Sequence, residues 1–163
     1  NVWCNDKTNV TDTSYNPWSY GGNATGLGYG TNKTYYGATQ RLVGTSGSAG
    51  GTGPSLKCNG ELSKINSKVG LITADELAYA GYADGLQNTT TYLQENATDT
   101  DWWSLSPSYF RGSGAIVWYV NGSDGGFNSG GVNFINGLRP SISLKPSTNV
   151  TGDGTSEKPY VVN

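Results

Sequence analysis

Hydrophobic and polar positions are patterned most clearly in the second half of the chain, where they predict an antiparallel sheet. The strongest strand is Ala115–Val120, which has β-branched and aromatic side chains on both faces, as expected of a central strand. Residues 121–126 form a cluster of turn residues after it, and the polar segment 127–133 is predicted to return as its hairpin partner. An earlier strand, 101–106, is expected to enter a turn at Pro107.

Two further segments complete the expected sheet. In 137–144 apolar residues alternate with polar ones, and Pro140 places this segment at an edge or a bulge. The side chains predicted to face the core are those of Leu138, Ile142 and Leu144. After a loop at 150–155, Tyr160–Val162 is predicted to be a closing strand.

The first half of the chain has helical signals. Thr73 and Glu76 are spaced as a capping box ahead of a short apolar stretch, and Gly81 is expected to end that helix. In 34–43 three apolar residues share one helical face, so a short helix is expected there as well. The apolar residues 69–72, just before the capping box, are predicted to form a buried strand.

These elements together predict the fold class α+β, with two short helices in the first half and a mainly antiparallel sheet in the second. The length of 163 residues suits one domain, 1–163, with a core of its own. Within it, 1–60 is expected to be loop-rich and clipped by a disulfide. The segment 61–163 is expected to hold a helix and the antiparallel sheet core.

The composition excludes several classes of function. The chain has no histidine, so it lacks the usual base of hydrolytic triads and a common zinc ligand. The net charge is −2 without a basic cluster, which argues against nucleic-acid binding. The acidic residues are scattered, and the pair Asp75 and Glu76 fits the first turn of a helix better than a catalytic role. We therefore expect a protein that is not an enzyme and needs no cofactor.

Two cysteines, Cys4 and Cys58, permit one disulfide, and an extracellular type of composition favours it over two buried thiols. It would close a loop of more than fifty residues. The chain-entropy treatment of such a loop gives roughly 4 kcal/mol of stabilisation. Residues 55–58 are expected to form a short strand tied to the N-terminus.

Seven Asn-x-Ser/Thr triplets occur along the chain. That is about double the number expected by chance, so composition alone and true N-glycosylation are both open interpretations. Under either interpretation the asparagines should lie in loops. The candidate positions are Asn9, Asn23, Asn32, Asn88, Asn96, Asn121 and Asn149.

Aromatic residues concentrate between positions 102 and 119. Because neighbours along a strand face opposite sides, the pairs 102–103 and 118–119 should each send one ring inward and one outward. Outward rings would stack on a sugar, anchor a protein partner or pack beneath loops. Arg139 is expected to bond loop carbonyls or a carboxylate, with anion binding as the alternative. The candidate ligand-binding residues are Trp102, Trp103, Tyr109, Trp118, Tyr119 and Arg139.

Single aspartates also occur in glycine-rich turns, at Asp124 and Asp153. A calcium ion needs six to eight oxygen ligands, with several carboxylates close together. Single aspartates of this kind are more typical of turns than of a calcium site.

Short motifs in a fixed order resemble a group of uncharacterised bacterial surface proteins that is common in gut Firmicutes. The motifs are Trp3–Asp6, Tyr35–Gly37 with Arg41–Leu42, Val69–Glu76, Trp102–Pro107, Gly137–Pro140 and Gly152–Val162. Members of that group often begin with a type IV prepilin-like leader and a long apolar helix. The resemblance implies that this chain is a globular head that follows such a stalk and contacts copies of itself in a filament. Any membrane contact is then expected only through a segment outside this sequence.

The order Trp-Trp-Ser-x-Ser-Pro, strand, hairpin and Gly-x-Arg-Pro is also similar to the C-type-lectin-like architecture. Formylglycine-generating enzymes of that architecture depend on cysteines near the C-terminal end, whereas both cysteines lie in the first sixty residues here, so no catalytic residue carries over. The expected function is that of an extracellular cell-surface module, the head of a pilin-like filament subunit or an adhesin. The alternative is a lectin-like module that binds a host or cell-surface protein or glycan through surface aromatics.

Overall fold

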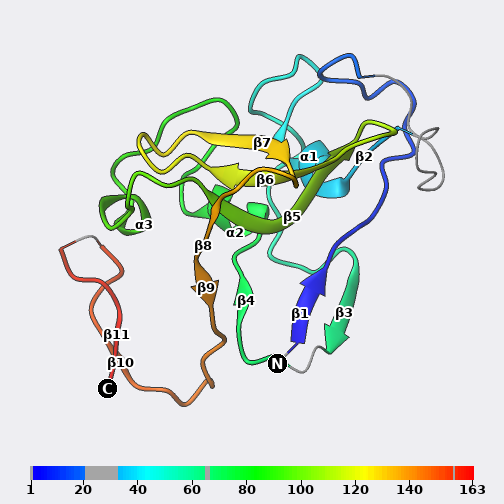
Figure 1. The fold of residues 1–163 in the computed structure, drawn as a ribbon. Coiled ribbons are helices and arrows are strands. Elements are labelled where there is room, and N and C mark those ends of the chain that lie inside the picture. Colours follow the sequence, from blue (N-terminus) through cyan, green and yellow to red (C-terminus); the bar gives the residue numbers. More distant parts are fainter. Residues whose placement is uncertain (1, 21–32, 65–66, 156) are drawn as a thin grey trace.

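The computed structural model describes residues 2–20, 33–64, 67–155 and 157–163 (Figure 1). The elements in chain order are β1 (Val2–Asn5), β2 (Thr34–Tyr35), α1 (Gly37–Leu42), β3 (Glu61–Lys64), β4 (Gly70–Leu71), α2 (Ala74–Tyr79), α3 (Tyr92–Glu95), β5 (Trp102–Phe110), β6 (Ala115–Val120), β7 (Phe127–Gly131), β8 (Gly137–Leu138), β9 (Pro140–Ser141), β10 (Val150–Thr151) and β11 (Val161–Val162). The helices are short and the strands pair mainly antiparallel, so the chain forms a small α+β domain, as predicted. No helix in the described part has the length and apolar character that a bilayer crossing requires.

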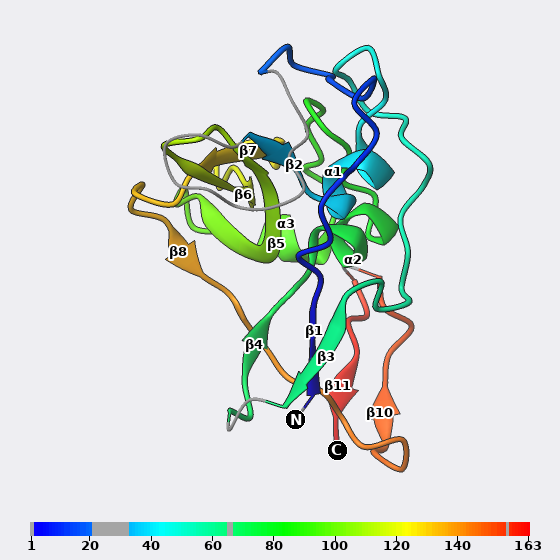
Figure 2. The ribbon, with the colours of Figure 1, turned by 90° about the vertical axis from the view of Figure 1, so that its right-hand side faces the viewer.

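The central sheet has the strand order β2-β5-β6-β7, and β8 adds a short parallel pairing with β5. The strand β6 lies between β5 and β7, which confirms the central position predicted for Ala115–Val120. The predicted hairpin is also confirmed, since β6 and β7 pair antiparallel across the turn 121–126. Figure 2 shows α1 and α2 together on one side of this sheet.

A stripe of buried serines explains how closely the helices approach β5. Ser104, Ser106 and Ser108 alternate along the strand and face the helical side. The Oγ of Ser106 accepts a hydrogen bond from the backbone N–H of Ala74, the first residue of α2, at 3.0 Å. The Oγ of Thr39 in α1 donates to the carbonyl of Ser108 at 2.7 Å. The Ser106 hydroxyl therefore pairs a backbone N–H at the start of α2 that an apolar side chain would leave unpaired. The small serines also let α1 come close enough for Thr39 to reach the β5 backbone.

Pro107 lies inside β5, and the predicted turn at this position is wrong. The pairing of β5 with β6 shifts register on either side of Pro107, between Trp103 and Pro107 and again between Pro107 and Tyr109. Proline has no N–H to donate to a ladder and is tolerated where a strand is irregular. The strand consequently runs on to Phe110.

The core consists of two adjoining clusters. The larger lies between the helices and the sheet, where Trp118 stacks on Phe127 with ring centroids 4.7 Å apart. The smaller surrounds Tyr35 and Tyr109, and Trp18 packs against both clusters. The larger cluster contains Ala38, Leu42, Val43, Ala74, Leu77, Tyr82, Trp102, Trp118, Val120 and Phe127.

The capping box predicted ahead of α2 is confirmed. The Oγ of Thr73 accepts from the N–H of Glu76, and the Glu76 carboxylate accepts from the N–H of Thr73. Gly81 follows the helix with φ +95°, a conformation that glycine adopts without strain. The other predicted helix is shorter than expected because Thr34 and Tyr35 pair with β5 instead. The helix α3, capped by Thr91, was not predicted.

Three two-stranded ribbons, β1–β3, β4–β9 and β10–β11, lie below the central sheet in Figure 1. The strand that pairs with the N-terminal β1 is β3, so the strand predicted at 55–58 is wrong. In that segment the N–H of Ser55 donates to the Asp75 carboxylate, and the N–H of Lys57 donates to the Ser55 hydroxyl, so neither joins a ladder. The predicted closing strand also leaves the central sheet, because β11 pairs with β10.

The inward orientation predicted within 137–144 is wrong. Leu138, Ile142 and Leu144 are 66%, 62% and 47% exposed. The segment divides into β8, which pairs with β5, and β9, which pairs with β4 outside the central sheet. The strand predicted as buried at 69–72 is reduced to the half-buried β4 for the same reason. An alternating pattern indicates a strand, but it does not show whether another layer covers it.

Candidate functional site

A cavity of about 800 Å³ lies where the ribbons meet the helices and β5. Its size falls within the usual range of small-molecule pockets. Four of the short motifs noted in the sequence contribute to its wall, although they are far apart in the sequence. The lining comes from Val2–Asp6, Arg41, Ser55–Cys58, Leu71–Thr73, Asp75, Glu76, Leu105–Pro107 and Ser141–Ser143.

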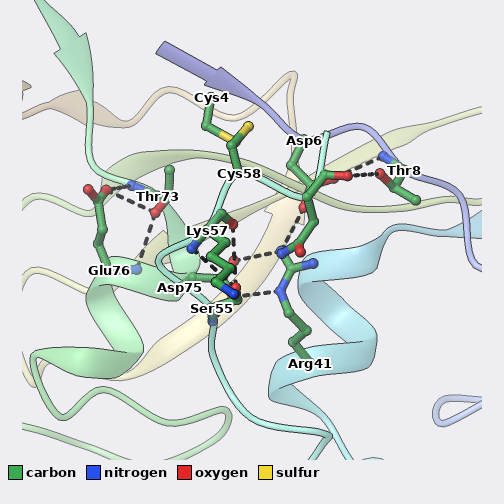
Figure 3. Close-up of a disulfide and its surroundings, with 11 residues drawn as sticks. Cys4, Asp6, Thr8, Arg41, Ser55, Lys57, Cys58, Thr73, Asp75 and Glu76 are labelled. Carbon is green, nitrogen blue, oxygen red and sulfur yellow. Dashed lines mark hydrogen bonds and ion pairs between the residues drawn. A yellow bond between two sulfur atoms is a disulfide. The ribbon is translucent and has the colours of Figure 1, made fainter. Parts of the chain in front are cut away.

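The predicted disulfide Cys4–Cys58 is confirmed and forms part of this wall (Figure 3). The two Cα atoms lie 5.4 Å apart, and the bond fastens β1 to the irregular segment after Pro54. The Oγ of Thr8 adds a second link by donating to the carbonyl of Asn59 at 3.2 Å. The N-terminal arm is therefore held against the middle of the chain by one covalent bond and local polar contacts.

Beside the disulfide, Arg41 joins two aspartates from different elements (Figure 3). Its Nε and Nη2 donate to the two carboxylate oxygens of Asp75 at 2.6 and 2.7 Å. The same Nη2 donates to Asp6 at 2.7 Å, and the N–H of Ser55 donates to Asp75 at 2.9 Å. Asp75 is only 4% exposed. The cluster thus connects α1, α2, the N-terminal arm and the segment that carries Cys58.

The electrostatics of this cluster favour permanent charge. Burial raises the pKa of Asp6, but hydrogen bonds from Thr8 and Arg41 outweigh it and hold that pKa below its usual value. Burial alone would lower the pKa of Arg41, and the hydrogen bonds to Asp75 and Asp6 raise it instead. Both oxygens of Asp75 are occupied by Arg41, so the cluster acts as a cross-link rather than as an acid and a base.

The two acidic residues at the start of α2, Asp75 and Glu76, have different roles. Glu76 closes the capping box, as the sequence predicts. Asp75 does more than favour the start of a helix, because it carries the buried ion pair with Arg41. Its partner lies 34 residues earlier, and the sequence holds no local signal that would join the two.

The aromatic candidates occupy opposite sides of the sheet. Trp102, Tyr109 and Trp118 are buried in the core, whereas Trp103 and Tyr119 are half-buried on the opposite face. The predicted alternation within the pairs 102–103 and 118–119 is confirmed. The two outward rings meet edge to face, with centroids 6.0 Å apart and planes at 77°.

These outward rings belong to a cross-strand row, which we call the outer-face row. Trp103 pairs with Leu138 on one side and with Tyr119 on the other, and Tyr119 pairs with Asn128. Phe134 adjoins this row and is 57% exposed. A Cβ atom at Gly130 would lie 3.2 Å from both Tyr119 Cε1 and Phe134 Cδ2, so the glycine leaves room for the two rings. The part played by Asn128 and Phe134 was not predicted, because it depends on strand register.

Arg139 has the structural role that the sequence favours. Its guanidinium donates to the carbonyls of Leu93 and Asn96 at 2.5 and 3.1 Å. These are carbonyls at the end of α3 that the helix itself leaves without partners. The same group lies 4.9 Å from the centroid of the Trp102 ring. Arg139 therefore joins α3 to the sheet.

Comparison with known proteins adds no relative. No family model, curated protein or solved structure matches the chain. The chemistry of the cavity and of the outer-face row is therefore the basis on which a function is assigned.

The structure describes five of the seven triplet asparagines, and Asn23 and Asn32 lie outside the described residues. Asn88, Asn96, Asn121 and Asn149 lie in loops or turns, as predicted, whereas Asn9 forms an isolated β-bridge with Tyr36. At Asn88 and Asn121 the side-chain oxygen accepts from the N–H and hydroxyl two residues later. Asp12 and Asp153 accept in the same way. The triplets at Asn88 and Asn121 thus form local turns. Glycosylation of the triplets stays a prediction.

The aspartates considered for calcium are also occupied locally. Asp124 accepts from the amide of Gln87 at 2.7 Å and from the N–H of Gly126 at 2.8 Å. Asp153 accepts from Thr155. Within the ranges that the structure describes, no three histidine, cysteine or acidic side chains gather as a metal site would require.

Proposed function

We propose that this chain is a non-enzymatic extracellular module that acts by contact at the cell surface, as the head of a pilin-like filament subunit or as an adhesin. The disulfide supports an oxidising environment, because such bonds persist mainly outside the cytosol. The C-type-lectin-like architecture belongs to the same proposal, and the antiparallel sheet with α1 and α2 on one side supports it.

The observation that carries this proposal is the apolar surface that the fold leaves in water. The turn between β7 and β8 exposes Val132, Phe134 and the whole side chain of Ile135, and Leu138 follows on β8. Leu56 and Ile142 are exposed where their residues line the cavity. Grouped apolar side chains of this kind mark contact surfaces more often than isolated ones do. A module that works by contact explains them. In the cavity, both carboxylate oxygens of Asp75 are already engaged by Arg41, so Asp75 is not placed as a free acid or base.

The proposal predicts where the protein is found and what its loss removes. Antibody against the folded chain should label intact cells of the source organism, and deletion of the gene should abolish surface filaments or adhesion. Complementation with Ile135→Asp should restore surface labelling but weaken assembly or adhesion. Tyr160→Asp, at an exposed position on the C-terminal ribbon, is the matched control. Confinement of the protein to the cytosol would contradict the proposal.

A lectin-like module is the second candidate. The observation that favours it is the half-buried edge-to-face pair Trp103 and Tyr119, which lies on the face of the sheet opposite the core residues Trp102 and Trp118. Both candidates act by contact and require no cofactor, so they differ in the partner that is bound.

A further inference from the structure

We propose that the outer-face row binds a neutral carbohydrate, which stacks on Trp103 and Tyr119 and is hydrogen-bonded by Asn128. This inference rests on the proposed contact function and names a site and a ligand class for it. Of the sequence-based candidates the site keeps Trp103 and Tyr119 and adds Asn128. Trp102, Tyr109 and Trp118 are buried and do not face a ligand.

The register of the sheet gives the site its shape. Leu138, Trp103, Tyr119 and Asn128 lie side by side across four neighbouring strands, β8, β5, β6 and β7. They project from the same face because each pair lies directly opposite in the ladder. The strands β5 and β6 are fixed from beneath by the buried rings of Trp102 and Trp118. A site on such strands is held more firmly than one on a loop.

The two rings form a corner. Their planes stand at 77°, so one ring presents its face where the other presents an edge. A pyranose has one or two faces of C–H groups, and these pack well on an aromatic face. Phe134 extends the apolar surface beyond Tyr119, across the position of Gly130.

Polar groups of the row are free to bond hydroxyls. The Trp103 indole N–H, the Tyr119 hydroxyl and the Asn128 amide have no hydrogen-bond partner within the described ranges. Together they offer donors on all three side chains and acceptors on Tyr119 and Asn128. Hydroxyl-rich ligands need this combination of an apolar surface with a few placed polar groups.

The charges around the row select an uncharged ligand. No residue of the row carries a charge, which leaves nothing to neutralise a phosphate backbone. Burial raises the pKa of Tyr119, and the carboxylates of Asp101 and Asp124 raise it further, so their negative field reaches the Tyr119 hydroxyl. Asp101 accepts a hydrogen bond from the N–H of Gly122. Asp124 accepts from the N–H of Gly126 and from the side-chain amide of Gln87. Sialylated or sulfated sugars would be repelled at this end of the row.

The test is an array of neutral, sialylated and sulfated oligosaccharides probed with the folded chain, followed by calorimetry with the tightest neutral binder. Trp103→Ala and Tyr119→Ala should each weaken binding by about tenfold or more, the loss expected for one aromatic contact. Tyr119→Phe keeps the ring and removes the hydroxyl, so it should weaken binding less than Tyr119→Ala. Asn128→Ala should also weaken it. The matched control is Tyr92→Ala, which removes an exposed ring on α3 and should leave affinity unchanged within about twofold.

Several outcomes would overturn the inference. These are no binding to any neutral glycan, binding confined to acidic glycans, a protein partner without glycan binding, or full affinity in both Trp103→Ala and Tyr119→Ala. Circular dichroism of each variant separates loss of the site from loss of the fold. A chain that labels the cell surface and supports assembly but binds no glycan would leave the proposed function intact. Glycan binding by a protein confined to the cytosol would overturn the proposed function alone.

Discussion

The head and the ribbons of this molecule are stabilised in different ways. The head, which comprises the central sheet with α1 and α2, buries Trp102, Trp118, Leu77 and Phe127 almost completely. Of the ribbons β1–β3, β4–β9 and β10–β11, the last leaves its valines exposed, whereas Trp3 of β1 and Leu71 of β4 are half-buried. Figures 1 and 2 show the ribbons extending from one end of the head.

The ribbons nearest the cavity are held by specific links in place of a core. The disulfide attaches β1 to the segment that carries Cys58, and the Arg41 cluster attaches Asp6, the residue after β1, to α1 and α2. The ring of Trp3 covers Gly70, where a Cβ atom would lie 2.6 Å from Cε3 of Trp3. Such links fix position but bury little area, so we expect the ribbons to open locally at a lower free energy than the head.

The largest effect is expected from a cavity in the head. Trp118→Ala removes a ring that is fully buried against Phe127, so it should lower the free energy of unfolding by about 3–5 kcal/mol. Urea denaturation measures this loss. The matched variant Trp103→Ala lies on the half-exposed face of the same sheet and should cost clearly less. Equal losses of unfolding free energy in Trp118→Ala and Trp103→Ala would contradict the assignment of one buried and one partly exposed face to the central sheet.

Removal of the disulfide should affect the ribbons more than the head. Cys4→Ser combined with Cys58→Ser should cost about 2–4 kcal/mol, since it frees a long loop in the unfolded chain. Hydrogen exchange should show early loss of protection in 2–6 and 55–60, while β6 keeps its slow exchange. Simultaneous loss of protection in β6 would show that head and ribbons unfold as one unit.

Loss of Arg41 should have a smaller but specific effect. Arg41→Met leaves Asp75 buried beside the apolar wall without its cation, and the partial exposure of the pair reduces the cost to about 2–3 kcal/mol. Asp75→Asn in the same chain should recover part of this loss, because it removes the uncompensated charge. A double-mutant cycle in urea measures the coupling. Additive losses would contradict a direct ion pair.

Local signals made part of the fold predictable. The capping box at Thr73 and Glu76 and the hairpin β6–β7 each depend on residues close in sequence, and both are confirmed. The pattern at 137–144 also indicates strands, but alternation holds no information about a covering layer. Leu138 and Ile142 therefore face water instead of a core.

The candidate sites depend on contacts that no local pattern encodes. The alternation of Trp103 and Tyr119 with buried neighbours could be predicted from strand geometry alone. The position of Asn128 beside Tyr119 depends on the register of β6 with β7. The pairing of Arg41 with Asp75 needs the packing of α1 against α2 and β5.

The smallest expected effect concerns opposite responses to pH in the two regions. Asp84, which pairs with the edge of β7, is half-buried in the head, and burial raises its pKa to about 6. Its folded pKa is above the unfolded value, so its protonated form favours folding and stability is lost as pH rises through about 6. Asp84→Asn should therefore stabilise the chain by about 1 kcal/mol at pH 8, after allowance for solvent screening, and by almost nothing near pH 4.

Asp6, at the ribbon side of the cavity, provides the contrast. Its pKa is lowered, so its contribution is present above the unfolded value and is lost as pH falls through the folded pKa. Asp6→Asn should thus destabilise the chain at pH 8 and have little effect in strong acid, the reverse of Asp84→Asn. Urea midpoints at several pH values measure both profiles. If the two variants showed parallel profiles, the charge of Asp84 would be as well stabilised by its surroundings as that of Asp6. The proposed electrostatic difference between the head and the ribbons would then be contradicted.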